Sequence, residues 1–179
     1  MGEIHVKQPV LLILPAFAAE ESALLWAKHQ ASELFGPIAL ESETFRFDRF
    51  TDYYAPSMGP ELLKRIWAFE RLIDPERLAA VKVATNRLEE EYTRIAETPG
   101  RPLNLDPGYI DLGKLVLAST KDHAHRIYLQ QGIFAELTLI YTKKQWQPLP
   151  WTYPDYQSKE YHEFFDRCRK VLRETLANT

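Results

Sequence analysis

The chain has 179 residues, of which 45% are hydrophobic and 26% are charged, as in an ordinary globular protein. Its formal net charge of −3 gives no general attraction to nucleic acid or to an anionic membrane, which argues against both as partners. The longest apolar run, Val10 to Leu14, is too short to cross a bilayer, and the single Cys168 cannot form an internal disulfide. We therefore expect one domain over residues 1–179, in the reducing cytoplasm.

Hydrophobic spacing predicts nine elements in the order β-α-β-β-α-β-β-β-α. The first is a buried strand at 9–17, because this segment is continuously apolar. A helix follows at 18–35 and ends at Gly36-Pro37, a glycine followed by a residue that cannot continue it. The apolar stripe of this helix is Leu24, Ala27, Ala31, Leu34 and Phe35.

Two strands are expected next, one at 38–50 that is exposed on one side and one at 65–73, where a helix over 61–69 is the alternative. Between them, residues 51–60 form a tight segment in which two prolines flank a Met-Gly pair. Asp74-Pro75-Glu76 is the clearest helix start, since Asp74 can cap and Pro75 suits the first turn. This helix should continue to about Ala96, burying Leu78, Val81, Thr85, Leu88, Tyr92 and Ile95.

The C-terminal part begins with a predicted turn at 104–109 and a strand at 114–120. A hairpin is expected from 126–129 and 133–141, joined by residues 130–132. The aromatic, proline-punctuated segment 146–156 is expected to be irregular, and 158–177 to be an amphipathic helix. The fold prediction is therefore α+β, a ferredoxin-like split βαβ sandwich with an antiparallel or mixed sheet, an added hairpin and a C-terminal helix.

Several tracts of the chain, taken in order, carry a resemblance to a known family. They are TDYY (51–54) with MG (58–59), KVATNRLE (82–89), NLDPGY (104–109), KLVLAST (114–120), HRIYL (125–129), AELT (135–138) and LPWTYPDY (149–156). Together they resemble the domain of unknown function 4416 family of bacterial and archaeal proteins, over nearly the whole chain. The resemblance implies a single-domain plan of this size and supplies no activity. The sequence has no G-x-x-x-x-G-K-[ST] loop to cradle phosphates.

The connection at 119–126 concentrates hydroxyls, imidazoles and cations beside a strand end. It could hold a phosphate or carboxylate, with Arg126 as a planar two-pronged donor and Lys121 as a second cation. The alternative is a solvated connection whose polarity reflects exposure. His123 and His125 share one face of an extended segment, but a metal would need a third ligand such as Glu136 or Asp106, and we predict no metal site.

Glu136 interrupts an otherwise apolar strand, where it should share a face with Phe134, Thr138 and Ile140 while Ile133, Ala135, Leu137 and Leu139 point to the helices. A carboxylate on a partly covered sheet face needs a cation or a donor, and desolvation would raise its pKa into a range useful for proton transfer. Glu136 is therefore a candidate acid or base. The alternatives are a structural ion pair or simple exposure.

On the helix from Asp74, the side chains of Lys82, Asn86 and Glu89 form one stripe beside the buried face. Lys82 could bind an anion and Asn86 could orient a carbonyl or base edge; the alternative is a solvated flank. Asp106 is a further candidate ligand contact, although an Asp-Pro-Gly turn more often uses its aspartate to cap the backbone.

The segment 146–156 contains Trp146, Trp151, Tyr153 and Tyr156 among three prolines, and we refer to it as the aromatic strap. It could stack on a planar ligand or bind a protein, but core packing is the more common use of such side chains. Cys168 should be a buried apolar filler.

These features favour a pocket for a small anionic ligand, nucleotide-like or phosphate-like, with Glu136 and His125 as the catalytic candidates. Its ligand-binding candidates are Lys82, Asn86, Asp106, Lys121 and Arg126. Whether the chain is an enzyme, and with which cofactor, stays open at this point. The alternative function is a non-catalytic protein-interaction module or homodimer, joined through the aromatic strap or an edge strand.

Overall fold

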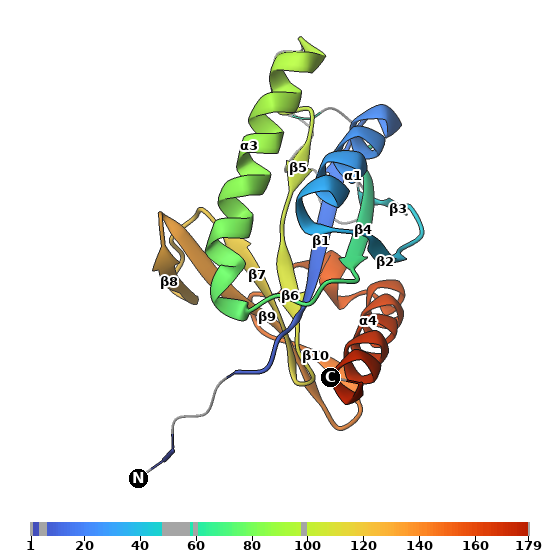
Figure 1. Ribbon diagram of the computed structural model, residues 1–179. Helices are drawn as coiled ribbons and strands as arrows, with labels where there is room; N and C mark the ends of the chain where they lie inside the picture. The colour runs from blue at the N-terminus through green and yellow to red at the C-terminus, as the bar shows by residue number, and fades with distance from the viewer. Residues whose placement is uncertain (1, 4–6, 48–57, 59–60, 98–99, 179) are drawn as a thin grey trace.

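The computed structural model of the protein describes residues 2–3, 7–47, 58, 61–97 and 100–178 (Figure 1). Its helices are α1 (Glu21–Phe35), η2 (Pro75–Arg77), α3 (Leu78–Ala96), η3 (Pro154–Gln157) and α4 (Lys159–Ala177). Its strands are β1 (Leu11–Ala18), β2 (Ile38–Glu41), β3 (Phe45–Arg46), β4 (Leu63–Phe69), β5 (Asn104–Leu105), β6 (Gly108–Ile110), β7 (Lys114–Ser119), β8 (Arg126–Gln130), β9 (Ile133–Thr142) and β10 (Gln145–Pro148).

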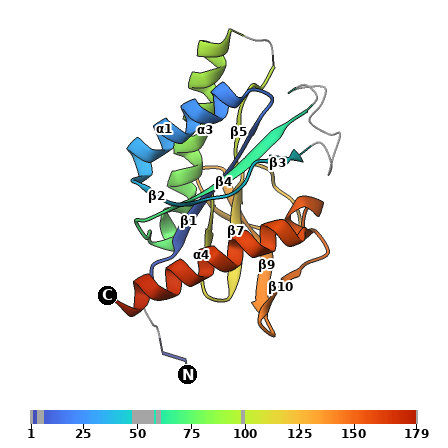
Figure 2. The ribbon, with the colours of Figure 1, turned by 90° about the vertical axis from the view of Figure 1, so that its right-hand side faces the viewer.

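The described strands form one sheet in the order β10-β9-β7-β6-β1-β4-β2, and the pairings within it are antiparallel. Three short strands lie off this path: β3 pairs with β4, β5 with β1, and β8 with β9. Helices α1 and α3 pack on one face of the sheet and α4 on the other, as Figure 2 shows from the side. Strand β1 lies between these layers, so all eight of its residues are buried.

The α+β class is confirmed, and so are the helix start at Asp74 and the glycine that follows the first helix. The Asp74 carboxylate accepts a hydrogen bond from the Glu76 backbone at 3.1 Å, and the helical segment ends at Ala96 as predicted. Gly36 follows α1 with a φ of 96°, the left-handed region that glycine adopts without strain. The predicted burial of Leu34 and Ile95 is wrong, since both are more than half exposed near the ends of their helices.

Residues 104–109, predicted as a turn, instead supply strands β5 and β6, which pair with β1. Gly108 also allows β7 to approach β6 closely, because a Cβ at this position would lie 2.4 Å from the carbonyl oxygen of Val116. The strand expected at 38–50 is divided into β2 and β3, and its end at 48–50 lies outside the described residues. The tight segment at 51–60 lies outside them too, except for Met58.

Two further predictions need correction in the C-terminal part. The aromatic strap is not wholly irregular, because it contains most of β10 and a turn of η3. Leu139 packs on the α4 face rather than with Leu137 against α3, because the pairing of β7 with β9 shifts register between Leu115 and Val116. A shift of one residue moves the following side chains to the opposite face.

The described helices include none with the length and apolar character needed to span a membrane.

A buried ion pair joins β4 to the turn that precedes α4. Lys64 Nζ lies 2.6 Å from Asp155 Oδ2, and both side chains are only 3% exposed. The ammonium group also lies over aromatic rings, 4.7 Å from the centroid of Phe47 and 4.8 Å from that of Tyr156. The pair therefore connects residues 91 positions apart in the sequence, within a largely aromatic environment.

Removing one partner of this pair should destabilise the protein strongly, because the other charge stays buried without compensation. Lys64→Met should lower the free energy of unfolding by about 3–5 kcal/mol, measured by urea denaturation. The double variant Lys64→Met/Asp155→Asn should recover part of this loss. The matched control, Lys170→Met, removes the exposed Lys170–Glu174 pair and should change stability by about 0.5 kcal/mol or less. Equal effects of the two lysine substitutions would contradict a structural role for the Lys64–Asp155 pair.

Candidate functional site

A cavity of about 200 Å³ lies beside β1, between the β5 segment and the end of β7. Strand β6 pairs with β7 as far as Gly108 and Leu117, whereas β5 pairs with β1 at Ala16 and Phe17. The end of β7 and the β5 segment therefore separate, and the cavity opens between them. Its cationic lining residues are Lys64, Lys82, Arg101, Lys121 and Arg126, and its acidic ones are Asp106, Glu136 and Asp155.

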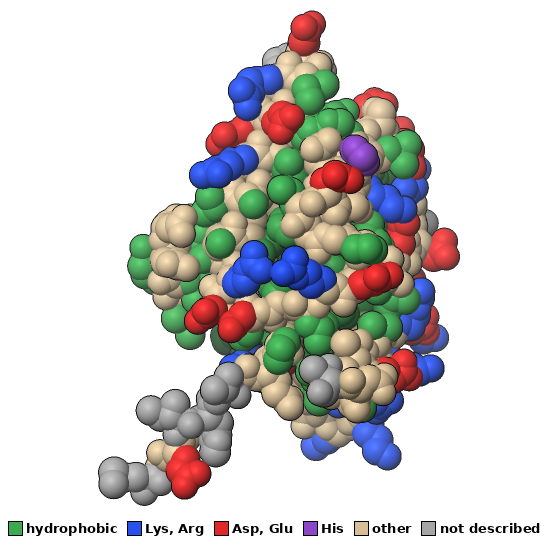
Figure 3. Space-filling model, in the orientation of Figure 1, with side chains coloured by type: hydrophobic (Ala, Val, Ile, Leu, Met, Phe, Trp, Pro, Cys, Tyr) green, Lys and Arg blue, Asp and Glu red, His purple; other side chains and the backbone are tan. Residues whose placement is uncertain are grey.

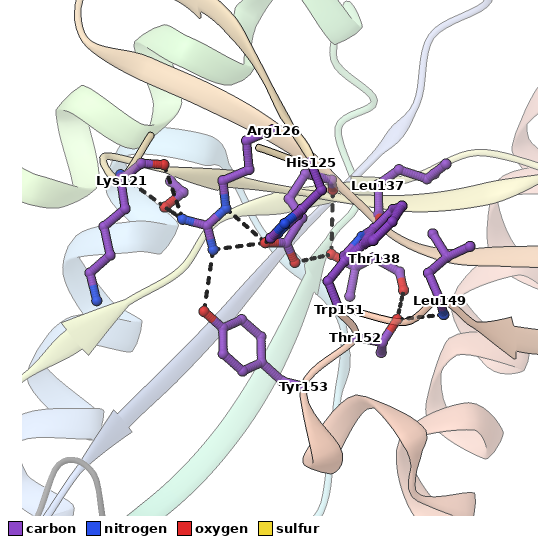
Figure 4. A network of polar contacts seen from close by, with 11 residues as sticks. Lys121, His125, Arg126, Leu137, Thr138, Leu149, Trp151, Thr152 and Tyr153 are labelled. Carbon is purple, nitrogen blue, oxygen red and sulfur yellow. Dashed lines mark hydrogen bonds and ion pairs between the residues drawn. The ribbon is translucent and has the colours of Figure 1, made fainter. Parts of the chain in front are cut away.

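Arg126 is the most highly connected side chain in this lining, and it is 4% exposed (Figure 4). Its Nε and Nη2 atoms lie 2.8 and 2.7 Å from Oε2 of Glu136. Its Nη1 donates to Ser119 Oγ at 2.6 Å and to the Lys121 carbonyl oxygen at 3.1 Å. Nη2 also donates to the Tyr153 hydroxyl at 3.2 Å. All three side-chain nitrogens of Arg126 are thus engaged with the protein itself.

Glu136 is 2% exposed and lies directly opposite Arg126 in the pairing of β8 with β9. Its Oε2 is 3.1 Å from His125 Nε2, and its Oε1 accepts from the Thr138 hydroxyl at 3.2 Å. The His125 ring stacks on Trp151, with the ring centroids 5.0 Å apart. The carboxylate is thus paired with a cation and hydrogen-bonded at both oxygens, as a buried charge requires.

A second polar group lies where α3 faces β5. Lys82 is buried, and its Nζ donates to the Leu105 carbonyl oxygen at 2.6 Å and lies 3.4 Å from Asp106 Oδ1. Oδ2 of Asp106 accepts from the Asn104 amide at 2.6 Å. Behind them, Glu89 accepts from the Leu105 backbone N–H at 2.7 Å. Glu89 Oε2 also accepts from Arg101 Nη2, at 2.6 Å.

The two carboxylates of this group have opposite pKa shifts. Burial raises the pKa of Asp106, but the charges of Lys82, Lys64 and Arg101 outweigh it and hold the pKa below its usual value. Burial likewise raises the pKa of Glu89, and there Lys82 and Arg101 oppose it without reversing it. Asp106 is therefore an ionised acceptor at neutral pH, and its side chain is 33% exposed at the cavity.

The structure brings five of the seven site residues predicted from the sequence into one cavity, namely Lys82, Asp106, Lys121, Arg126 and Glu136. His125 contacts Glu136 without lining the cavity itself. Asn86 is half-buried on α3 and does not line the cavity formed by the described residues. Across residues 2–3, 7–47, 58, 61–97 and 100–178, no group of three or more His, Cys, Asp or Glu side chains is arranged to hold a metal ion.

Sequence reasoning missed Lys64 and Asp155, which both line the cavity. A signal for Lys64 exists, because alternation along β4 puts it on the same face as Ile66 and Ala68, two buried core residues. Asp155 had no comparable signal, since it lies in the aromatic strap beside two tyrosines.

The aromatic strap has two parts with different roles. Trp146 and Tyr156 pack in the core beneath α4, as the packing alternative expects. Tyr153 is 44% exposed at the cavity, and Trp151 Nε1 donates to the Leu137 carbonyl oxygen at 2.8 Å. Cys168 is buried in the same core, where burial raises the pKa of its thiol.

Comparison with known families gives one result for this chain. Residues 8–171 match the family described as Domain of unknown function (DUF4416). No curated protein and no solved structure matches the chain. The match covers far more than half of the sequence and agrees with the resemblance of its motifs, so the protein belongs to the DUF4416 family.

Proposed function

We propose that the protein binds a small anionic ligand, of the phosphate or nucleotide kind, in the cavity beside β5 and β7. The observation that carries this proposal is the concentration of charge around one cavity. Among the described residues, five cationic and three acidic side chains line the cavity, an excess of two positive charges, or one when Glu89 behind the wall is included. In a space partly shielded from water, such an excess favours an anion.

The individual side chains differ in what they can offer to this ligand. Lys121 is an exposed cation at the rim, and Ser119 and Tyr153 supply hydroxyl groups. Arg126 and Lys82 are each held by partners within the protein, so they contribute positive potential rather than free donors. Acid-base catalysis by Glu136 and His125 stays a prediction; the 3.1 Å contact between them is the route by which they could exchange a proton.

Two finer predictions belong to the same proposal. A ferredoxin-like core is supported by the order β2-β4-β1-β6 and by α1 and α3 sharing one face of the sheet. In that arrangement β5 and β6 would take the place of the fourth strand. A cytoplasmic location is supported by the single, buried Cys168, which has no disulfide partner in the sequence.

A second candidate function is homodimerisation through β8, favoured by the exposed side chains of this strand. Ile127, Tyr128 and Leu129 are 72%, 59% and 39% exposed, and among the described strands only β9 pairs with β8. Figure 3 shows hydrophobic side chains at the left margin of the molecule, where Figure 1 places β8. An antiparallel pair of β8 strands centred on Tyr128 would oppose Ile127 to Leu129 and bring no like charges together.

The anion-binding proposal predicts that inorganic phosphate and phosphate esters raise the melting temperature of the protein. A ligand at a hundred times its dissociation constant adds about 2.7 kcal/mol to the free energy of unfolding. Lys121→Glu should weaken phosphate binding at least about tenfold, because it reverses a charge at the cavity. Lys170→Glu, a charge reversal on the exposed face of α4, is the control and should bind like the wild type. If millimolar phosphate and phosphate esters leave the melting temperature unchanged, the proposal is wrong.

The dimer candidate predicts that the wild-type protein sediments as a dimer. Ile127→Lys should convert it to a folded monomer, because it sets a charge in the middle of the paired strands. Leu34→Lys alters another exposed apolar residue, on α1, and should leave the dimer intact. A wild-type protein that remains monomeric at its highest soluble concentration would exclude this candidate.

A further inference from the structure

We propose that the cavity binds a phosphate ester of a hydroxyl-bearing small molecule, with its phosphate on the hydroxyls of Ser119 and Tyr153 and a ligand hydroxyl on Asp106. This inference rests on the proposed anion-binding function and specifies its ligand. It also gives Arg126 the role of a positioning residue rather than that of a direct ligand contact.

Arg126 determines the direction in which the two hydroxyl groups donate. Ser119 Oγ accepts hydrogen bonds from Arg126 Nη1 at 2.6 Å and from the Lys121 backbone N–H at 3.1 Å. Both lone pairs of this oxygen are then used, and its hydrogen is left to donate elsewhere. The Tyr153 oxygen likewise accepts from Arg126 Nη2, at 3.2 Å.

Hydroxyls that accept from a cation are stronger donors, because hydrogen bonds in a chain polarise one another. Ser119, Tyr153 and the exposed Lys121 all line the cavity, and Arg126 contacts each of the three. This end of the cavity therefore offers several donors to one group. A phosphate monoester, with three terminal oxygens and a charge of about −1.5 to −2, matches it.

The Asp106 end of the cavity offers a hydrogen-bond acceptor instead of donors. Lys82 and Asn104 each contact one oxygen of this carboxylate, and its remaining lone pairs are unused by these contacts. The carboxylate is a third exposed and lines the cavity. A phosphate group would be repelled here, whereas a hydroxyl group would be bound as a donor.

The hydroxyl group of Tyr156 is a further potential donor to a ligand. Tyr156 lines the cavity, and within the described part of the chain its buried hydroxyl has no hydrogen-bond partner. Burial and the neighbouring Asp155 raise the pKa of this hydroxyl well above its usual value, so the group keeps its proton. A buried unsatisfied donor is unfavourable, and a ligand or water acceptor in the cavity would relieve it.

Isothermal titration of the full chain with three probes tests the assignment: ribose 5-phosphate, inorganic phosphate and ribose. The wild type should bind ribose 5-phosphate most tightly, inorganic phosphate less tightly and ribose least. Ser119→Ala and Tyr153→Phe should each weaken both phosphate-containing probes about tenfold, the effect of one charge-assisted hydrogen bond. Asp106→Asn should weaken ribose 5-phosphate about tenfold and leave inorganic phosphate unweakened.

The controls are matched substitutions away from the cavity: Ser22→Ala, Tyr92→Phe and Asp166→Asn should bind all three probes like the wild type. Thermal melting establishes that each variant is folded. If the wild type binds no phosphate-containing probe, the anion-binding function itself fails. If it binds them but Ser119→Ala and Tyr153→Phe retain wild-type affinity, only the present inference is overturned. It is also overturned if Asp106→Asn weakens inorganic phosphate as much as ribose 5-phosphate.

Discussion

The buried pair between Arg126 and Glu136 is the interaction on which the candidate site depends. Both side chains are almost fully removed from solvent, and an unpaired charge there would be strongly unfavourable. The pair is tolerated because Ser119, Tyr153 and the Lys121 carbonyl take the remaining donors of the guanidinium group. One cation thereby fixes the end of β7, the connection that follows it and the exposed part of the aromatic strap. The shape and polarity of one cavity wall follow from this.

The Lys64–Asp155 pair also lines the cavity, and the same physics applies to it. It joins β4 to the turn before α4, whose apolar side packs in the core on that face of the sheet. Both pairs connect segments that are distant along the chain or belong to different elements. Ion pairs within the protein that frame a cavity reduce the ordering that a ligand must impose, which lowers the entropic cost of binding.

How much the sequence could predict depends on the range of the interaction. The Asp74 cap, the continuous burial of β1 and the apolar stripe of α4 are local signals, and each was predictable. Strands β5 and β6 were mistaken for a turn because their pairing with β1 is a long-range contact that the local sequence does not signal. Charged residues of the site such as Lys82 and Glu136 could be predicted, because they interrupt apolar elements of the sequence. The predicted hairpin with its connection at 130–132 is compatible with Arg126 opposite Glu136. The pairing of Lys64 with Asp155 could not be predicted, because only folding brings these distant segments together.

The central claim is that the protein's own ion pairs stay intact while hydroxyl groups bind the anion. A crystal structure of the protein grown with inorganic phosphate tests it most directly. The account predicts a phosphate ion in the cavity, within hydrogen-bonding distance of Ser119 Oγ and the Tyr153 hydroxyl, with Arg126 still on Glu136. A phosphate seated on the Arg126 guanidinium with the Glu136 carboxylate displaced, or a cavity left without phosphate, would contradict it.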